Sequence, residues 1–229
     1  MDARTTNTVQ TADRVSAFLW KVYGWMAVGL GLTAIVAFAV AGSPDLLRVL
    51  VGNRLVFFAL VIAELGLVFF LSARADRLAP GTAAGLFALY SALNGVTLSV
   101  ILLAYTGESV TMTFVVTAGM FGALALFGST TKRSLAGAGQ FFMMGLIGLI
   151  LASIIGMFWH NDALQFLISV VGVIVFTGLT AWDAQRLKQM ALALPDGQVG
   201  SYAIVGALSL YLDFINLFLM LLRFTGRRD

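Results

Sequence analysis

The sequence predicts an all-α integral membrane protein, a single bundle of seven transmembrane helices. Hydrophobic residues make up 60% of the 229 residues and charged residues only 11%, against about a quarter charged residues in soluble domains. The mean hydropathy is +0.96. Apolar runs of the roughly 20 residues that one crossing needs follow one another along nearly the whole chain. No room is left for a second, soluble domain.

The expected spans follow a polar N-terminal segment, residues 1–21, which we expect to be cytoplasmic. This polar segment precedes the first apolar run, and no small-residue cleavage site follows that run. We therefore interpret the first apolar run as a retained helix and not as a signal peptide. The remaining residues, 22–229, form the transmembrane domain. Its spans are expected at Val22–Ala41, Leu55–Ala73, Ala83–Tyr105, Val110–Gly128, Gln140–Trp159, Ala163–Trp182 and Ala203–Leu222.

The gaps between these spans hold all three prolines, Pro44, Pro80 and Pro195. Proline lacks the backbone donor that a helix interior needs, so its position supports the boundaries. Small residues at four-residue spacing, Gly148, Ala152 and Gly156, predict close contact between helices. We expect that contact within one molecule and not at a dimer seam.

The basic residues predict that the N-terminus lies inside, because loops with more Lys and Arg stay in the cytoplasm. Nine of the fourteen then lie on the inner side: Arg4, Arg14, Lys21, Arg74, Arg77, Lys132, Arg133, Arg186 and Lys188. Arg48, Arg54, Arg223, Arg227 and Arg228 lie outside. A last segment that enters and turns back would bring the C-terminal arginines inside, but we expect seven crossings.

The composition excludes many kinds of chemistry. Cysteine is absent and His160 is the only histidine, which excludes disulfides, zinc clusters and cysteine nucleophiles. We therefore expect no enzyme and no cofactor. The net charge of +3 comes from short clusters beside apolar runs, which indicates lipid head groups and cytosol and not nucleic acid.

The residues most able to carry chemistry are carboxyls inside the spans. Glu64 and Asp213 lie at the centres of the second and last spans, where a charged side chain costs about 2.5–3.5 kcal/mol. Each is therefore either used or neutralised, and a protonated, hydrogen-bonded structural carboxyl remains the alternative. Helical spacing places Ser209 and Asn216 on the side of Asp213, and Asn94 and Tyr211 add polar groups at membrane depth that can satisfy a buried carboxyl.

Asp183 ends the sixth expected span, in the run AWDAQRLK. A helix C-terminus disfavours an acid, so an interfacial pair with Arg186 is one interpretation. Ca²⁺ takes six to eight oxygens, and three carboxyls with a few amides fall short of that. We expect calcium to pass through and not to be bound tightly.

Four runs carry a family resemblance over essentially the whole chain: FLWKVYGWMAVGLGLTA, AELGLVFFLSAR, TAWDAQRLK and, most specific, GALSLYLDFINLFLMLLRFTG. They resemble the bacterial branch of the transmembrane Bax inhibitor motif family. The resemblance implies a last helix surrounded by the other six, a pH-sensitive calcium leak and, in this branch, a location in the bacterial inner membrane.

The resemblance also implies residue roles. Asp183 and Asp213 would face each other as a di-carboxylate proton sensor and gate, with transient calcium near them, while Glu64 and Arg223 would line the pore. A latch arginine would fall at Ala75, so Arg74 or Arg77 must take that role. The depth of each residue in the membrane tests whether the two aspartates can meet. At 1.5 Å per residue Asp213 lies about 15 Å below the inner surface, whereas the expected span puts Asp183 almost at that surface. The two meet only if the sixth helix is sunk by a turn or two; otherwise depth pairs Asp213 with Glu64 as readily.

Three functions remain open. The leading one is a calcium-permeable leak gated by the Asp183–Asp213 pair, whose like charges make it titrate as a unit. The second is a non-conducting stress factor that binds a membrane protease or another membrane protein. The third is a proton-coupled antiporter, which the same carboxyls would serve.

Overall fold

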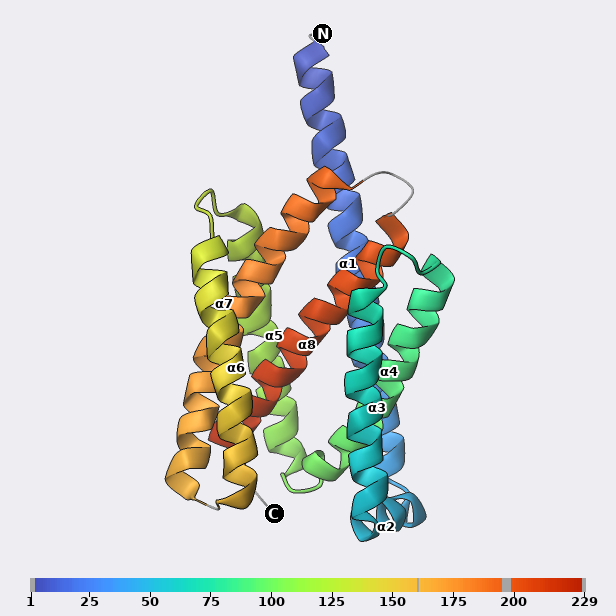
Figure 1. Ribbon diagram of the computed structural model, residues 1–229, viewed down its shortest axis with the longest axis vertical. Helices are drawn as coiled ribbons and strands as arrows, with labels where there is room; N and C mark the ends of the chain where they lie inside the picture. The colour runs from blue at the N-terminus through green and yellow to red at the C-terminus, as the bar shows by residue number, and fades with distance from the viewer. Residues whose placement is uncertain (1–2, 160, 195–198, 228–229) are drawn as a thin grey trace. The chain divides into compact units, whose positions relative to one another are not determined.

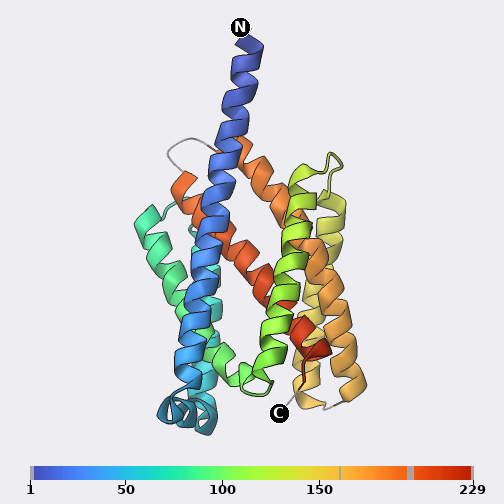
Figure 2. The ribbon, with the colours of Figure 1, turned by 180° about the vertical axis from the view of Figure 1, so that it is seen from behind.

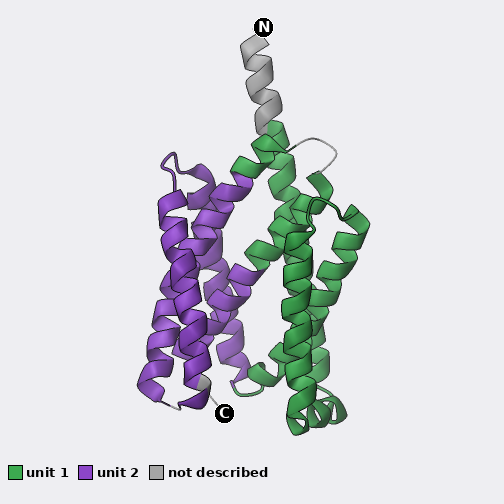
Figure 3. Ribbon diagram, viewed as in Figure 1, with its two compact units in different colours: residues 1–104, 189–211 green, residues 105–188, 212–229 purple. Residues whose placement is uncertain are grey.

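The computed structural model is all-helical, and it describes residues 3–159, 161–194 and 199–227 (Figure 1). Seven of its helices are long and apolar enough to cross a membrane, which confirms the expected fold class and number of spans. Pro195 and Arg228 lie outside the described residues. The helices belong to two compact units, coloured separately in Figure 3.

Unit 1 contains residues 1–104 and 189–211. Its helices are α1 (Ala3–Ala41), α2 (Pro44–Gly52), α3 (Arg54–Ala73) and α4 (Pro80–Leu102), joined by the end of α7 and the first half of α8. Figure 2 shows α1 along its whole length. Gly95 lets α4 approach α1, because a Cβ there would lie 2.7 Å from the Thr33 carbonyl oxygen.

One end of unit 1 brings together segments that the sequence places far apart. Arg14 donates a hydrogen bond to the Leu194 carbonyl, and Gly200 packs against Pro80. The start of α1, the turn between α3 and α4 and the start of α8 therefore lie at the same end, and α2 lies at the other (Figure 1). This arrangement is the one that alternating crossings require.

Unit 2 contains residues 105–188 and 212–229. It is built from α5 (Gly107–Thr130), α6 (Ala136–Phe158), most of α7 (Asp162–Ala193) and the second half of α8 (Val199–Thr225). Leu149, Phe176, Leu179 and Leu217 belong to its buried apolar core, together with Ile168, Val175, Met220 and Leu221. The Arg227 carbonyl accepts a hydrogen bond from the Thr106 backbone N–H, which fastens the end of the chain to the start of α5.

The last helix is the most buried of the seven spans. Within its most apolar window 72% of residues are buried, against 11% for the window of α3. One half of α8 contributes to each unit. It is also one uninterrupted helix, so the last segment does not turn back, as the seven-crossing prediction expects.

The helices differ from the expected spans in a few places. The sixth span does not end at Trp182, because α7 continues to Ala193. The gap after the first span holds a short helix, α2, with Pro44 in its first turn, where proline is tolerated. Of the small residues expected at a helix contact, Gly148 does not face a neighbour closely, because a Cβ there would meet no atom within 4 Å. Gly156 does pack against α7, where its Cβ would lie 3.0 Å from Gln165 Nε2.

Candidate functional site

Asp183 on α7 and Asp213 on α8 form a buried carboxyl pair in unit 2. Their residues are 8% and 6% exposed, and the charge of Asp183 acts directly on the Asp213 carboxyl. Two like charges held this close in an apolar surrounding are not both ionised without a large cost. The geometry therefore suits a pair that shares a proton.

The length of α7 explains how Asp183 and Asp213 can lie at similar depths in the membrane. Because α7 ends at Ala193, Asp183 lies ten residues, or about 15 Å, from that end of the helix. Asp213 lies fourteen residues, or about 21 Å, from the start of α8 at Val199. The two carboxyls thus lie about one turn apart in depth, as the sunken sixth helix of the sequence argument requires.

Asp183 also has a cation next to it on its own helix. Arg186 Nη1 lies 3.8 Å from Asp183 Oδ1, and the guanidinium lies over the Trp182 ring at 5.6 Å from its centroid. The Arg186 side chain is 53% exposed and that of Asp183 is 11% exposed. Asp183 therefore lies near both the Arg186 guanidinium and the Asp213 carboxyl.

Two polar residues that the sequence argument did not single out hold α7 in place beside the pair. Gln185 Nε2 donates to the Arg133 carbonyl at 2.9 Å, and the Leu135 N–H donates to Gln185 Oε1 at 2.8 Å. Lys188 Nζ donates to the Ser129 carbonyl at 2.7 Å. The sequence did hold a sign of these contacts, because both residues are polar and follow directly on an apolar span. Their partners, however, are backbone carbonyls and an N–H about fifty residues away.

The polar residues expected around Asp213 are arranged differently from the expectation. Asn216 Nδ2 donates to the Leu212 carbonyl of its own helix at 2.8 Å. Ser209 is half-buried and belongs to unit 1. Within the part of the chain that the structure describes, Asp213 Oδ2 has no hydrogen-bond partner. A buried acceptor in this condition is costly, and a proton on the carboxyl lowers the cost.

Glu64 lies in a separate polar network within unit 1. The residue is 9% exposed; Asn94 Nδ2 donates to its Oε2 at 3.3 Å, and Thr97 Oγ1 donates to its Oε1 at 2.9 Å. The Tyr211 hydroxyl donates to Asn94 Oδ1 at 3.0 Å and lies 2.6 Å from Thr33 Oγ1. The network joins α1, α3, α4 and α8, and the carboxyl that Asn94 satisfies is Glu64.

The expected latch and pore arginines are all exposed. Arg74 forms the C-cap of α3 and its guanidinium lies 5.6 Å from the centroid of the Phe70 ring. Arg77 Nε lies 3.6 Å from Asp76 Oδ2. Ala75, where the latch would fall by spacing, is buried. Arg223 lies in the last turn of α8.

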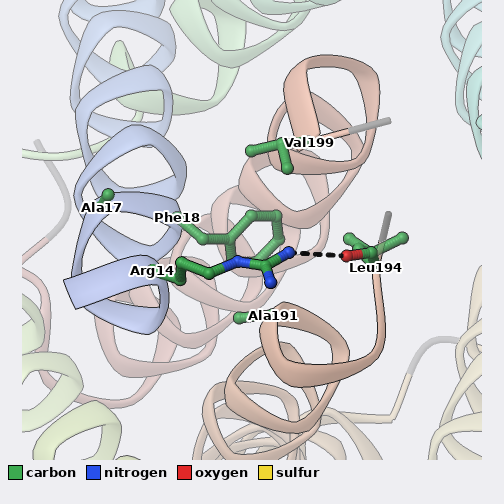
Figure 4. A pocket seen from close by; sticks show the side chains of 6 residues that line it. All are labelled: Arg14, Ala17, Phe18, Ala191, Leu194 and Val199. Carbon is green, nitrogen blue, oxygen red and sulfur yellow. Dashed lines mark hydrogen bonds between the residues drawn. The ribbon is translucent and has the colours of Figure 1, made fainter. Parts of the chain in front are cut away.

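A small cavity of about 110 Å³ lies at the end of unit 1 where α1 meets α7 and α8 (Figure 4). Phe18, Ala191 and Val199 line it, and Arg14 Nη2 reaches the Leu194 carbonyl at 3.2 Å. Leu194 directly follows α7, so Arg14 places a cation at the C-terminus of that helix, where a positive charge is stabilising. The cavity is thus the junction that ties α1 to the end of α7.

No cluster of three or more His, Cys, Asp or Glu side chains that could hold a metal ion occurs among the described residues. Among the described residues, the buried carboxyls are those of Asp183, Asp213 and Glu64. These are hard ligands of the kind that calcium takes.

The fold and the site together define the class: an all-helical membrane protein of seven spans, with carboxyls buried at membrane depth and a last helix that is mostly buried. The chain belongs to the Bax inhibitor family. The family described as inhibitor of apoptosis-promoting Bax1 (Bax1-I) matches residues 15–229, in agreement with the resemblance seen in the sequence.

Bacterial relatives match over almost their whole length. The inner membrane protein YbhL of Escherichia coli K12 is 49% identical over 228 residues, which cover 98% of this chain and 97% of the relative. A protein of Borreliella burgdorferi is 44% identical over 213 residues, 92% of each chain. A membrane protein of Streptococcus pyogenes serotype M1 is 39% identical over 218 residues, 94% of each chain. The chain is an integral membrane protein of this family, and its E. coli relative is named as an inner membrane protein.

Proposed function

We propose that this protein is a pH-sensitive, calcium-permeable leak channel in which Asp183 and Asp213 form the proton sensor and the gate. The observation that carries the proposal is the burial of these two carboxyls against each other in membrane-spanning helices. A charge at this depth is expensive, so two buried carboxyls side by side lower the stability of the fold. A functional use of the pair explains that cost.

The pair supplies the pH dependence. Above the range in which the pair titrates, at least one carboxyl is ionised and attracts cations; below it, both are protonated and neutral. The change in charge would alter the attraction between the pair and a mobile cation, for which Arg74 and Arg77 are the candidates. It thereby biases a closed arrangement against an open one.

Glu64 and Arg223 complete the proposal as pore residues. Glu64 is a carboxyl with two hydrogen-bond donors in unit 1, so it offers a fixed negative site for a divalent cation. Arg223 supplies a positive charge at the far end of α8. No tight calcium site is proposed, because a leak requires an ion to leave as readily as it enters.

Reconstitution into vesicles that contain a calcium indicator tests the proposal. Wild-type protein is expected to let calcium run down its gradient at a rate that depends on pH. Asp162→Asn is the matched control, because Asp162 lies in the first turn of the same helix as Asp183 and its loss should leave the flux unchanged.

The other outcomes identify the competing functions. Calcium movement against its own gradient, driven by an imposed pH gradient, would indicate a proton-coupled antiporter. No calcium movement at any pH, from protein shown to be folded, would overturn the channel. That result would favour a non-conducting protein that acts by binding a membrane protease or another membrane protein.

A further inference from the structure

We propose that Tyr211 is a positioning residue for Glu64: its hydroxyl fixes the side-chain amide of Asn94 so that the amide nitrogen always faces the Glu64 carboxyl. The inference concerns how Glu64 is held, and it rests on the proposed function only where Glu64 is taken as part of the pore. Nothing in the sequence pattern alone links Tyr211 to Glu64. The link is the chain of buried hydrogen bonds in unit 1.

A count of hydroxyl protons defines the direction of this chain. Thr33 Oγ1 lies 2.8 Å from the Ser91 carbonyl and 2.6 Å from the Tyr211 oxygen, but it carries one proton. Tyr211 likewise has one proton for two neighbours, Thr33 at 2.6 Å and Asn94 Oδ1 at 3.0 Å. At least one of these contacts must therefore go without a proton.

With the Asn94 amide as the structure has it, Oδ1 faces the Tyr211 hydroxyl and accepts its proton. Thr33 then donates either to the Ser91 carbonyl or to the Tyr211 oxygen. In either case the Ser91 carbonyl accepts the backbone hydrogen bond from residue 95 of its own helix. In the reverse arrangement Tyr211 donates to Thr33, and Asn94 Oδ1 loses its donor. A buried acceptor without a donor is costly, so donation from Tyr211 to Asn94 is favoured.

The orientation of the Asn94 amide follows. With Oδ1 accepting from Tyr211, Nδ2 is directed at Glu64 Oε2, at 3.3 Å. An amide turned by 180° would place an oxygen against the carboxyl oxygen, and two acceptors repel when the carboxyl is ionised. Without the Tyr211 hydroxyl, only Glu64 itself would choose between the two orientations. The Glu64 carboxyl would then lose the fixed donor that holds Oε2.

The aromatic ring of Tyr211 is held by other contacts, which separates the hydroxyl from the packing. The residue is 0% exposed, and its ring lies edge-on to Phe87 and to Tyr90, each at 5.7 Å between centroids. Tyr211→Phe keeps these contacts and removes only the hydroxyl. Tyr90→Phe is the matched control: Tyr90 is a buried neighbour of Tyr211, and its hydroxyl makes no hydrogen bond to Glu64, Asn94 or Thr33 among the described residues.

Infrared spectroscopy of the purified protein tests the inference without any flux measurement. The carboxyl band of Glu64 is first identified as the band that Glu64→Gln removes. We expect Tyr211→Phe to shift this band and Tyr90→Phe to leave it in place. Thr33→Val is the second variant; it removes the other partner of the Tyr211 hydroxyl and should shift the band in the same direction but by less.

Calcium flux provides the functional readout. The half-saturating calcium concentration is expected to rise roughly two- to tenfold in Tyr211→Phe, the effect of one lost hydrogen bond, with no change in Tyr90→Phe. An unshifted Glu64 band in both Tyr211→Phe and Thr33→Val, or an equal shift in Tyr90→Phe, would overturn the positioning role. A shifted band in a protein that carries no calcium would keep the positioning role and overturn the channel instead.

Discussion

At the scale of single residues, each buried carboxyl is placed by a different kind of partner. Asp183 lies 3.8 Å from Arg186 and also near the Asp213 carboxyl. Glu64 instead accepts hydrogen bonds from two neutral donors, Asn94 and Thr97. A carboxyl beside another carboxyl responds to protons as a pair, and a carboxyl held by neutral donors responds alone. The sensor and pore roles that we propose follow this difference.

The sensor prediction concerns the two aspartates. Asp183→Asn and Asp213→Asn should each flatten the pH dependence of calcium flux, because either change removes the mutual repulsion through which the pair shares a proton. The double substitution should add little to either single one, since the two residues act as one unit. Flux in vesicles, measured across a pH series, checks this.

Glu64→Gln provides the contrast for the sensor prediction. It should change the size of the flux and leave the pH midpoint largely in place. A midpoint that moves in Glu64→Gln but not in Asp183→Asn would assign the sensor to Glu64 and Asp213.

The latch prediction compares two exposed arginines. Arg74→Ala should raise the calcium leak at the pH values where at least one carboxyl of the pair is ionised and can attract a cation. Arg77→Ala is the matched variant, because Arg77 lies in the same turn and already has Asp76 at 3.6 Å. An effect of Arg77→Ala alone would move the latch there, and no effect of either would remove it from this protein.

At the scale of helices, close approach depends on glycines that face a neighbouring backbone. Gly128 on α5 is such a position, because a Cβ there would overlap the carbonyl group of Ala181 on α7. Gly122, on the same helix, is exposed and its Cβ would meet no atom within 4 Å. The contact of α5 with α7 lies one turn from Gln185, which holds the following loop.

Gly128→Ala should therefore destabilise unit 2. Backbone cannot move aside as a flexible side chain can, so we expect the free energy of unfolding to fall by about 1–3 kcal/mol. The matched variant Gly122→Ala should change it by less than about 0.5 kcal/mol. Unfolding in detergent, followed by circular dichroism, measures both. Equal losses of stability in the two variants would contradict the contact.

The helices show what the sequence could predict. The C-terminal ends of six of the seven spans lie within a few residues of the expected positions, because an apolar run of about 20 residues is typical of a membrane crossing. The end of α7 was missed because Asp183, Arg186 and Lys188 lower the hydropathy just where the helix continues to Ala193. Those charges are accommodated by contacts to Ser129, Arg133 and Leu135, which only the folded chain brings near.

Some residues of the candidate site could be predicted from the sequence and others could not. Glu64 and Asp213 were predictable, since a carboxyl at the centre of an apolar span is costly wherever its neighbours lie. The pairing of Asp213 with Asp183 came from the family resemblance, since depth alone allowed Glu64. Thr33 and Thr97 were not predictable, because a hydroxyl in a span usually bonds to its own helix. Only the spatial neighbours show that they belong to the Glu64 network.

At the scale of the whole molecule, seven crossings give the two ends of the chain opposite sides of the membrane. Reporter fusions that are active only in the cytoplasm should be active at Arg77 and Lys132, and inactive at Asp45, Asn161 and Gly226. The excess of Lys and Arg on the inner side is the physical reason. Equal activity at Lys132 and Asn161 would contradict the crossing by α6. Activity at Gly226 would contradict the crossing by α8.

The place of α8 in both units has a consequence for how the protein is made. The ribosome makes this helix after the other six spans, and until then each unit lacks a helix whose side chains are mostly buried. Neither interior can close early, although domains of many proteins fold in order as they are synthesised. Insertion of the final span is therefore the step that completes both halves at once. Nascent chains that stop before Val199 should be cut by proteases more readily than the full chain in the loops of both units.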